Sequence, residues 1–200
     1  MVLKGVLRGP LLTLAAGLAL GAAVRAQPPS DGPRYESSGE LVLPEDYRSW
    51  PFIGAGLGMT YDGERGTPQG DTPQFTHAFV NPSAYRHFMA NGTWPDGSVF
   101  MLEFRASASE GSINRSGRFA TDLVLLEAEV KDSRFPDGWA FFVFGAGDAL
   151  AKSAAPLSRE AAAPCVACHS EHAAVERTFV QFYPTLLEVA RDKGTLRPGF

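Results

Sequence analysis

The chain has 200 residues, and 44% of them are hydrophobic, which suits one globular domain that buries a core of its own. Its formal net charge is −4 at pH 7, and loss of the N-terminal Lys4, Arg8 and Arg25 would leave 15 of its 18 basic residues against 22 acidic ones. An acidic chain repels phosphate backbones, so this balance argues against nucleic acid as a partner.

Residues 1 to 26 have the pattern of a secretory signal peptide, with a basic start, an apolar run from Leu11 to Val24 and small side chains before Gln27. The apolar run is about 14 residues long, whereas a membrane-spanning helix needs roughly 20. We therefore expect cleavage after Ala26 and export to the periplasm, with an uncleaved membrane anchor as the alternative. No membrane contact beyond export is expected.

The segment after the expected cleavage site, residues 27 to 43, is rich in Pro, Ser, Gly and charge over most of its length and lacks apolar periodicity. Such a composition cannot bury enough apolar surface to offset the entropy of ordering. We expect it to be a flexible leader, followed by a single folded domain over residues 44 to 200.

From Pro44 the pattern changes to short apolar stretches separated by turn signals, which favours strands over long helices. Tyr47 to Trp50 predicts a short helical or turn entry, and Phe52 to Met59, with three glycines, predicts a loop or a strand that allows close backbone approach. Further on we expect strands over Phe75–Val80, Ser98–Ala106, Asp122–Lys131 and Trp139–Phe144, and a short helix over Ser83–Asn91. Turn tetrapeptides between the strands favour an antiparallel sheet.

The C-terminal part of the chain has a different pattern. From Glu171 to Lys193, apolar side chains recur at roughly helical intervals, and Pro184 is placed to kink or divide the helix. The sequence thus predicts a mainly β, α+β fold. Its parts are an antiparallel β-sheet, short helices and a C-terminal helical segment that carries the two cysteines.

Cys165, Cys168 and His169 match the pattern C-x-x-C-H, the attachment signature of c-type haem. Two thiols at this spacing add to the two vinyl groups of the macrocycle, and the adjacent imidazole is held beneath the iron as an axial ligand. We therefore expect one covalently attached haem c, bound through Cys165 and Cys168 and ligated on iron by His169. The other ring nitrogen of His169 is expected to donate to a backbone carbonyl or a carboxylate, which would fix the tautomer.

Three other uses of the two cysteines are kept as alternatives. A thioredoxin-like C-x-x-C needs a βαβ context, which the preceding Ala161 to Pro164 does not supply. A zinc site that recruits His172 would place its ligands too close in sequence for the usual paired knuckles. A plain disulfide leaves His169 without a role. The haem interpretation is the one that uses all three side chains of the motif.

The residues alone leave open what occupies the other face of the iron. The methionines and histidines that could serve as a sixth ligand are Met59, Met89, Met101, His77, His87 and His172. Several also have an ordinary structural role, because Met89 and Met101 lie in apolar patterns and His77 lies in an apolar strand. An iron whose sixth position is vacant or holds water is therefore a further hypothesis.

Seven segments extend the pattern beyond the cysteines and keep a characteristic order. They are Tyr47–Trp50, His77–Ala84, Pro95–Ser98, Glu129–Asp132, Gly138–Phe141, Cys165–His169 and Phe179–Pro184. With them the chain resembles the cytochrome P-460 family, which includes the hydroxylamine-oxidising haem-P-460 cytochromes and the gas-binding cytochromes c′-beta. The resemblance implies a mainly antiparallel β fold, a five-coordinate c-type haem and a homodimer.

The resemblance also implies a branch of the family. Members that oxidise hydroxylamine carry a lysine cross-linked to the macrocycle, in the strand after the Pro-Asp-Gly turn and just before a Glu. Here Leu102 precedes Glu103, and the strand contains no lysine. The cross-link is therefore expected to be absent, which makes the chain more similar to the cytochrome c′-beta type, where Phe side chains crowd the distal face. Phe79 and Phe100 are the predicted cap, and Leu102 and Glu103 complete the predicted distal pocket.

The function implied by this resemblance is a periplasmic mono-haem cytochrome whose open iron binds or detoxifies nitric oxide or a related small gaseous or nitrogenous ligand. One alternative is a haem oxidoreductase that oxidises hydroxylamine or acts as a peroxidase, so whether the chain is an enzyme stays open. The other is an electron-transport cytochrome that works with a redox partner protein. Glu103, Arg105 and Glu127 are candidates for a proton relay beside a bound ligand.

Overall fold

The computed structural model describes Met1, residues 31–60 and residues 72–200. Apart from Met1, the predicted signal peptide lies outside the described residues, as do residues 27–30 of the predicted leader. Among the helices of the described residues, none combines the length and the hydropathy that crossing a membrane requires.

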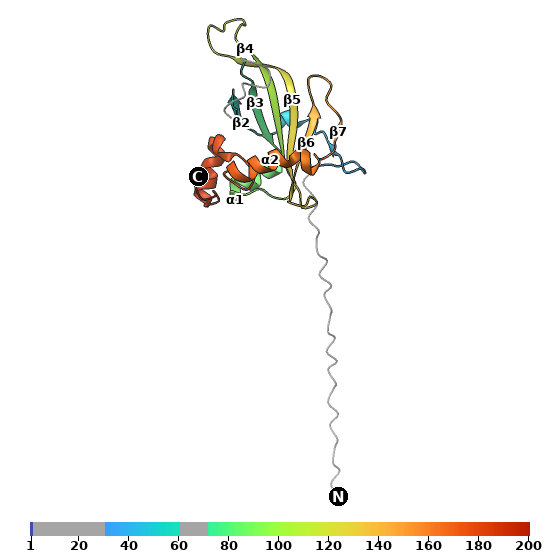
Figure 1. The fold of residues 1–200 in the computed structure, drawn as a ribbon. Helices are drawn as coiled ribbons and strands as arrows, with labels where there is room; N and C mark the ends of the chain where they lie inside the picture. Colours follow the sequence, from blue (N-terminus) through green and yellow to red (C-terminus); the bar gives the residue numbers. More distant parts are fainter. Residues whose placement is uncertain (2–30, 61–71) are drawn as a thin grey trace.

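Five strands form one antiparallel sheet in which each strand pairs with its neighbour in sequence (Figure 1). They are β2 (Phe52–Leu57), β3 (Phe75–Val80), β4 (Ser98–Ala108), β5 (Phe119–Lys131) and β6 (Trp139–Gly145). The predicted antiparallel sheet is confirmed. Phe52 to Met59, for which the sequence allowed either a loop or a strand, contains the edge strand β2. Strands β4 and β5 run further than expected, because they continue as a two-stranded ribbon to the pair Ala108 and Phe119, beyond the last pairing of β3.

Three short helices and two 3-10 turns accompany the sheet. They are α1 (Pro82–Asn91), α2 (Arg159–His172), α3 (Pro184–Lys193), η1 (Tyr47–Ser49) and η2 (Val180–Phe182). Helix α1 begins at Pro82, whose fixed φ suits a first helical turn, and ends at Asn91, after which Gly92 caps the helix with a left-handed φ of 73°. Pro184 occupies the same kind of position in α3, so it starts a helix instead of kinking one.

The alternation of side chains gives the sheet two faces with different neighbours. One face packs against Tyr47 and a two-stranded sheet of β1 (Leu41–Val42) and β7 (Ser153–Ala154). The opposite face packs against α1 and α3, and buried members of this second core include Val80, Phe88, Trp94 and Leu186. Helix α2 contacts β6 and lies across the ends of the strands (Figure 1). The faces are called here the β1/β7 face and the helical face.

Residues 31–43, which were expected to belong to a flexible leader, pack on the domain instead. Asp31 accepts a hydrogen bond from the backbone N–H of Ser83 at 2.8 Å, and the hydroxyl of Tyr35 donates to Asp132 at 2.9 Å. Leu41 is fully buried and pairs with β7. Average polarity suggested disorder, but a few widely spaced anchoring side chains are enough to hold this segment in place.

Candidate functional site

A cavity of about 420 Å³ lies between the helical face of the sheet and α2. This volume is within the range of roughly 300–1,000 Å³ that is typical of ligand and cofactor pockets, and the wall is mainly apolar. Strands β2 to β6 form one side, and α2 with residues 178–183 forms the other. The sheet side chains at the wall include Ala78, Phe100, Leu102, Phe104, Phe141 and Val143.

Strand register explains why these side chains meet. Phe100 and Leu102 share one face of β4, because alternate residues of a strand point the same way. Leu102 pairs with Ala78 on β3 and with Glu127 on β5, while Phe100 pairs with Glu129 on β5. The helical face therefore presents two carboxylates, those of Glu127 and Glu129, in an otherwise apolar wall.

Helix α2 places Cys165, Cys168 and His169 at the same cavity. Residues three apart lie on one side of a helix, so both thiols open toward the cavity, and both are free. Ser158 caps the start of the helix, because its hydroxyl oxygen accepts from the N–H of Ala161 at 3.2 Å. Burial, and after it the charge of Glu127, raises the pKa of the Cys165 thiol.

His169 is held in a defined orientation. Its Nδ1 lies 2.7 Å from the carbonyl oxygen of Arg177 and 3.2 Å from Oε1 of Glu129. Its ring makes edge contacts with Phe141 and Phe179, at centroid distances of 5.0 and 4.6 Å. Because Nδ1 already contacts these two oxygens, Nε2 is the ring nitrogen that remains available to bind a ligand or a metal ion.

Charge as well as geometry acts on this imidazole. Burial alone lowers the pKa of His169, but the Glu129 carboxylate and the Arg177 carbonyl raise it above the ordinary value overall. Burial raises the pKa of Glu129 in turn, and the nearby His169 opposes that rise. The pair is thus a largely buried imidazole and carboxylate that lie side by side in the cavity wall.

The family model described as Cytochrome P460 matches residues 44–180, which is more than half of the chain and includes the sheet and α2. The chain belongs to the cytochrome P460 family. The resemblance inferred from the seven segments is confirmed, and membership identifies the chain as a mono-haem cytochrome with haem as its cofactor. No curated protein matches the chain.

The residues at the cavity fit the haem that membership of the cytochrome P460 family implies. An apolar cavity suits a flat macrocycle, and the two free thiols and the imidazole on α2 supply the donor set of c-type attachment. The wall also contains a close contact between Gly54 and Tyr183. A side chain at Gly54 would overlap the ring of Tyr183, so β2 can approach this ring only with a glycine at that position. Among the described residues, no three His, Cys, Asp or Glu side chains are grouped so that they could hold a metal ion.

The four residues predicted for the distal pocket of this cytochrome divide between the two faces of the sheet. Phe100 and Leu102 line the cavity. Phe79 and Glu103 point to the β1/β7 face, where Phe79 packs against Tyr47 and Phe52 at centroid distances of 5.7 and 5.5 Å. Their assignment to the pocket is therefore corrected. Glu103 directly follows Leu102 in a strand, and consecutive side chains cannot point to the same face.

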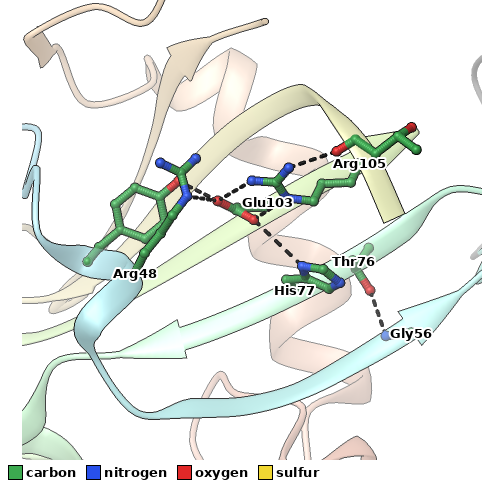
Figure 2. A network of polar contacts seen from close by, with 8 residues as sticks. Arg48, Gly56, Thr76, His77, Glu103 and Arg105 are labelled. Atoms are coloured by element: carbon green, nitrogen blue, oxygen red, sulfur yellow. Dashed lines mark hydrogen bonds and ion pairs between the residues drawn. The ribbon is translucent and has the colours of Figure 1, made fainter. Parts of the chain in front are cut away.

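Glu103 belongs to a separate polar network on the β1/β7 face, which Figure 2 shows. Its side chain is 2% exposed and accepts from the Tyr47 hydroxyl at 2.5 Å and from Nε of Arg48 at 2.8 Å. Arg105 binds both carboxylate oxygens, and His77 lies 3.6 Å away. Glu103 and Arg105 are thus structural partners, and of the three relay candidates Glu127 alone faces the cavity.

The candidates for a sixth ligand are also placed by the structure. Met59 lines the cavity and is 37% exposed. Met101 also borders the cavity, but its side chain is fully buried in the core of the β1/β7 face. The others lie elsewhere: Met89 of α1 packs against the core of the helical face, His77 joins the Glu103 network, and His87 and His172 are exposed. Within the described residues, Met59 is the candidate that the cavity favours.

Sequence reasoning missed Glu129 and Arg177 as partners of His169, and Gly54 as the place where the wall closes. Glu129 stood in one of the seven matching segments, and its spacing of two from Glu127 would have placed both on one face. The sequence predicted an acceptor for the second ring nitrogen of His169. It did not indicate that Arg177 supplies this acceptor. Gly54 and Tyr183 are far apart in sequence, and no local signal joins them.

Proposed function

We propose that this member of the cytochrome P460 family is a periplasmic c-type cytochrome whose open iron binds nitric oxide or a related small ligand. Thioether bonds to Cys165 and Cys168 would hold the haem, and Nε2 of His169 would ligate its iron. The haem supplies an iron centre to which a small ligand adds. The residues of the chain provide the orientation of the imidazole and the shape and polarity of the space beside it.

One observation carries the proposal: within the described residues, the cavity wall contains no lysine and no histidine other than His169. Leu102 stands at the position where the resemblance expects a cross-linking lysine, and it faces the cavity. Phe100, Phe104 and Leu102 form an apolar surface on β4 that gives a charged or strongly polar ligand no partner. Such a surface favours small neutral molecules over larger polar ones.

Met59 supports a second candidate, electron transfer to a redox partner protein. Its thioether lies at the cavity wall, and a methionine as sixth ligand is characteristic of electron-transfer cytochromes c. In that case the iron would be six-coordinate and closed to small ligands. Replacement of Met59 by Leu separates the two candidates, because it would open the iron only if Met59 had been bound.

Glu127 supports a third candidate, an oxidoreductase acting on hydroxylamine or peroxide. It is a carboxylate at the cavity wall with a pKa raised by burial, a property common to groups that move protons at active sites. The test is turnover of hydroxylamine with a dye acceptor, or of peroxide with a reducing dye. The expected result is no turnover above that of a Glu127→Gln variant.

The first experiment on the leading proposal is mass spectrometry of the peptide spanning Ala161 to Arg177 from the natively exported protein. We expect a haem adduct on this peptide, and its absence would contradict covalent attachment. Cys165→Ser with Cys168→Ser is the matched control, since it keeps the size of both side chains and removes the thiols.

The second experiment is an optical spectrum of the same protein, oxidised and then reduced, with and without nitric oxide. A high-spin, five-coordinate spectrum that changes on addition of nitric oxide is expected. A low-spin spectrum with a methionine-to-iron charge-transfer band would contradict the proposal and favour electron transfer. N-terminal sequencing of the exported protein tests cleavage after Ala26.

The oligomeric state follows from the resemblance as a further part of this proposal. Edge strand β2 has no partner on its outer side in the sheet that the described residues form, and its Phe52 and Leu57 are 54% and 48% exposed. An exposed apolar edge strand is a surface that proteins commonly cover. We expect a homodimer in sedimentation analysis of the haem-loaded protein.

A further inference from the structure

The carboxylate of Glu129 is enclosed beside the imidazole that is proposed to ligate the iron. Glu129 stands on β5, and its side chain is 10% exposed. Its Oε1 lies 3.2 Å from Nδ1 of His169 and, within the described residues, makes no hydrogen bond. A buried carboxylate oxygen without a hydrogen bond is costly, which suggests that its position serves another purpose.

Nδ1 of His169 therefore has two acceptors of different kinds. The carbonyl oxygen of Arg177, at 2.7 Å, is the closer acceptor and takes the N–H of the ring. The Glu129 carboxylate lies off that axis and, when it is ionised, places a negative charge at the same edge of the imidazole. In a buried site a charge at this distance is only weakly screened.

The surroundings keep the imidazole and the carboxylate in this relation. Phe141, which pairs with Glu129 across β5 and β6, makes an edge contact with the His169 ring, and Phe179 makes another. The charged groups that act on Glu129 are His169 and the guanidinium of Arg177, which partly offsets its charge. Glu129 thus reaches the imidazole from a rigid strand while His169 comes from a helix.

The geometry points to Glu129 as a positioning residue that sets the electron density of His169 and, through it, the properties of the iron. A carboxylate beside Nδ1 makes Nε2 a stronger donor, because the negative charge stabilises the positive charge that the ring gains when Nε2 donates its lone pair. A stronger donor strengthens the iron–histidine bond and favours ferric over ferrous iron. This inference rests on the proposed ligation of iron by His169 and adds a second residue to it.

Two variants of the haem-loaded protein form a matched pair for the test. Glu129→Gln removes the charge and keeps the size of the side chain. Glu127→Gln removes the same charge two residues away on the same face of β5, at a position that also lines the cavity but, among the described residues, makes no ion-pair contact with His169. The measurements are the iron–histidine stretching frequency of the ferrous protein, from resonance Raman spectra, and the reduction potential from spectroelectrochemistry.

We expect Glu129→Gln to lower the stretching frequency and to shift the potential to more positive values. Glu127→Gln should leave the frequency unchanged and shift the potential less. Glu129→Asp, which keeps the charge but withdraws it by one methylene, should give an intermediate frequency and carries the test if Glu129→Gln fails to load haem. Equal effects of Glu129→Gln and Glu127→Gln would overturn the inference, because general charge would then explain them.

Failure of this inference can be told apart from failure of the proposed function. An iron–histidine stretch in the original protein that Glu129→Gln does not move would overturn the role of Glu129 and leave His169 as the ligand. The absence of any such stretch from the original protein would overturn the ligation by His169, and the role of Glu129 with it.

Discussion

The two faces of the sheet use buried glutamates in opposite ways. On the β1/β7 face, Glu103 binds Tyr47, Arg48 and Arg105 (Figure 2). Burial alone would raise the pKa of Glu103, but these hydrogen bonds and the charges of both arginines lower it to about 2. On the helical face, Glu127 and Glu129 lie in an apolar wall, and burial raises the pKa of each.

This contrast separates a structural carboxylate from two carboxylates that the cavity surrounds. A buried charge that is fully paired holds the fold together, whereas an incompletely paired one costs stability. Proteins keep such costly groups mainly where a ligand or cofactor makes use of them. The electrostatics therefore favour the helical face as the functional side of the sheet, independently of the cysteine motif.

The largest effect is expected from removing Glu103. Glu103→Ala would leave the buried Tyr47 hydroxyl and the partly buried Arg105 guanidinium without their acceptor, at a cost of about 4 kcal/mol in the free energy of unfolding. Urea unfolding of the haem-loaded protein measures it. Because Glu103 does not line the cavity, the optical spectrum of the folded variant should match that of the original protein. A changed spectrum would contradict the separation of the two faces.

The same network predicts how stability depends on pH. The pKa of Glu103 is about 2 in the folded protein and 4.5 ordinarily, so the folded state binds fewer protons between these values. The stability that the ionised carboxylate contributes is fully present above about pH 4.5 and is lost as the pH falls toward 2. Unfolding free energies of the original protein and of Glu103→Gln should therefore converge over this window. A difference that stayed constant from about pH 5 to about pH 2 would contradict the lowered pKa.

The sequence predicted the elements of the fold better than it predicted which face a residue occupies. Strand Phe75–Val80 has the predicted bounds, because apolar residues end at an Asn-Pro turn that opens α1. The error at the distal pocket was to place both Leu102 and Glu103 there, although neighbours in a strand point apart. The alternation of side chains along a strand shows which residues share a face. To tell which face meets the cavity, the position of at least one residue relative to the cavity must also be known.

The remaining features of the site depend on contacts between distant segments. The C-x-x-C-H pattern is local and specific, so it predicted the cysteines and His169 as haem-binding residues directly. The pairing of His169 with Glu129 depends on how α2 lies against β5, and the contact of Gly54 with Tyr183 joins the edge strand to the start of α3. Such contacts are set by packing, which a single sequence does not display.

A smaller effect, on ligand binding alone, is expected at Leu102. Leu102→Ala removes bulk from the cavity wall, so the association rate of nitric oxide or carbon monoxide with the reduced protein should rise several-fold. Flash photolysis measures it. Phe79→Ala is the matched control on the β1/β7 face: it should lower the free energy of unfolding by about 3 kcal/mol and leave the association rate unchanged. A faster rate in Phe79→Ala would show that the two faces are coupled.

The smallest effect is expected at Arg48, and it shows which members of the Glu103 network matter. Arg48 donates to Glu103 at 2.8 Å, but its side chain is 52% exposed, whereas that of Arg105 is 21% exposed and binds both carboxylate oxygens. Water replaces an exposed partner at little cost, so Arg48→Gln should lower the free energy of unfolding by less than about 1 kcal/mol.

Arg105→Gln should cost more than Arg48→Gln in the same urea titration, because the fork of two hydrogen bonds is lost where water has little access. If Arg48→Gln and Arg105→Gln lowered the free energy of unfolding equally, charge alone would account for the lowered pKa of Glu103. Unequal losses would locate the stabilising contacts in the buried part of the network, where the hydroxyl of Tyr47 and the fork of Arg105 enclose the carboxylate.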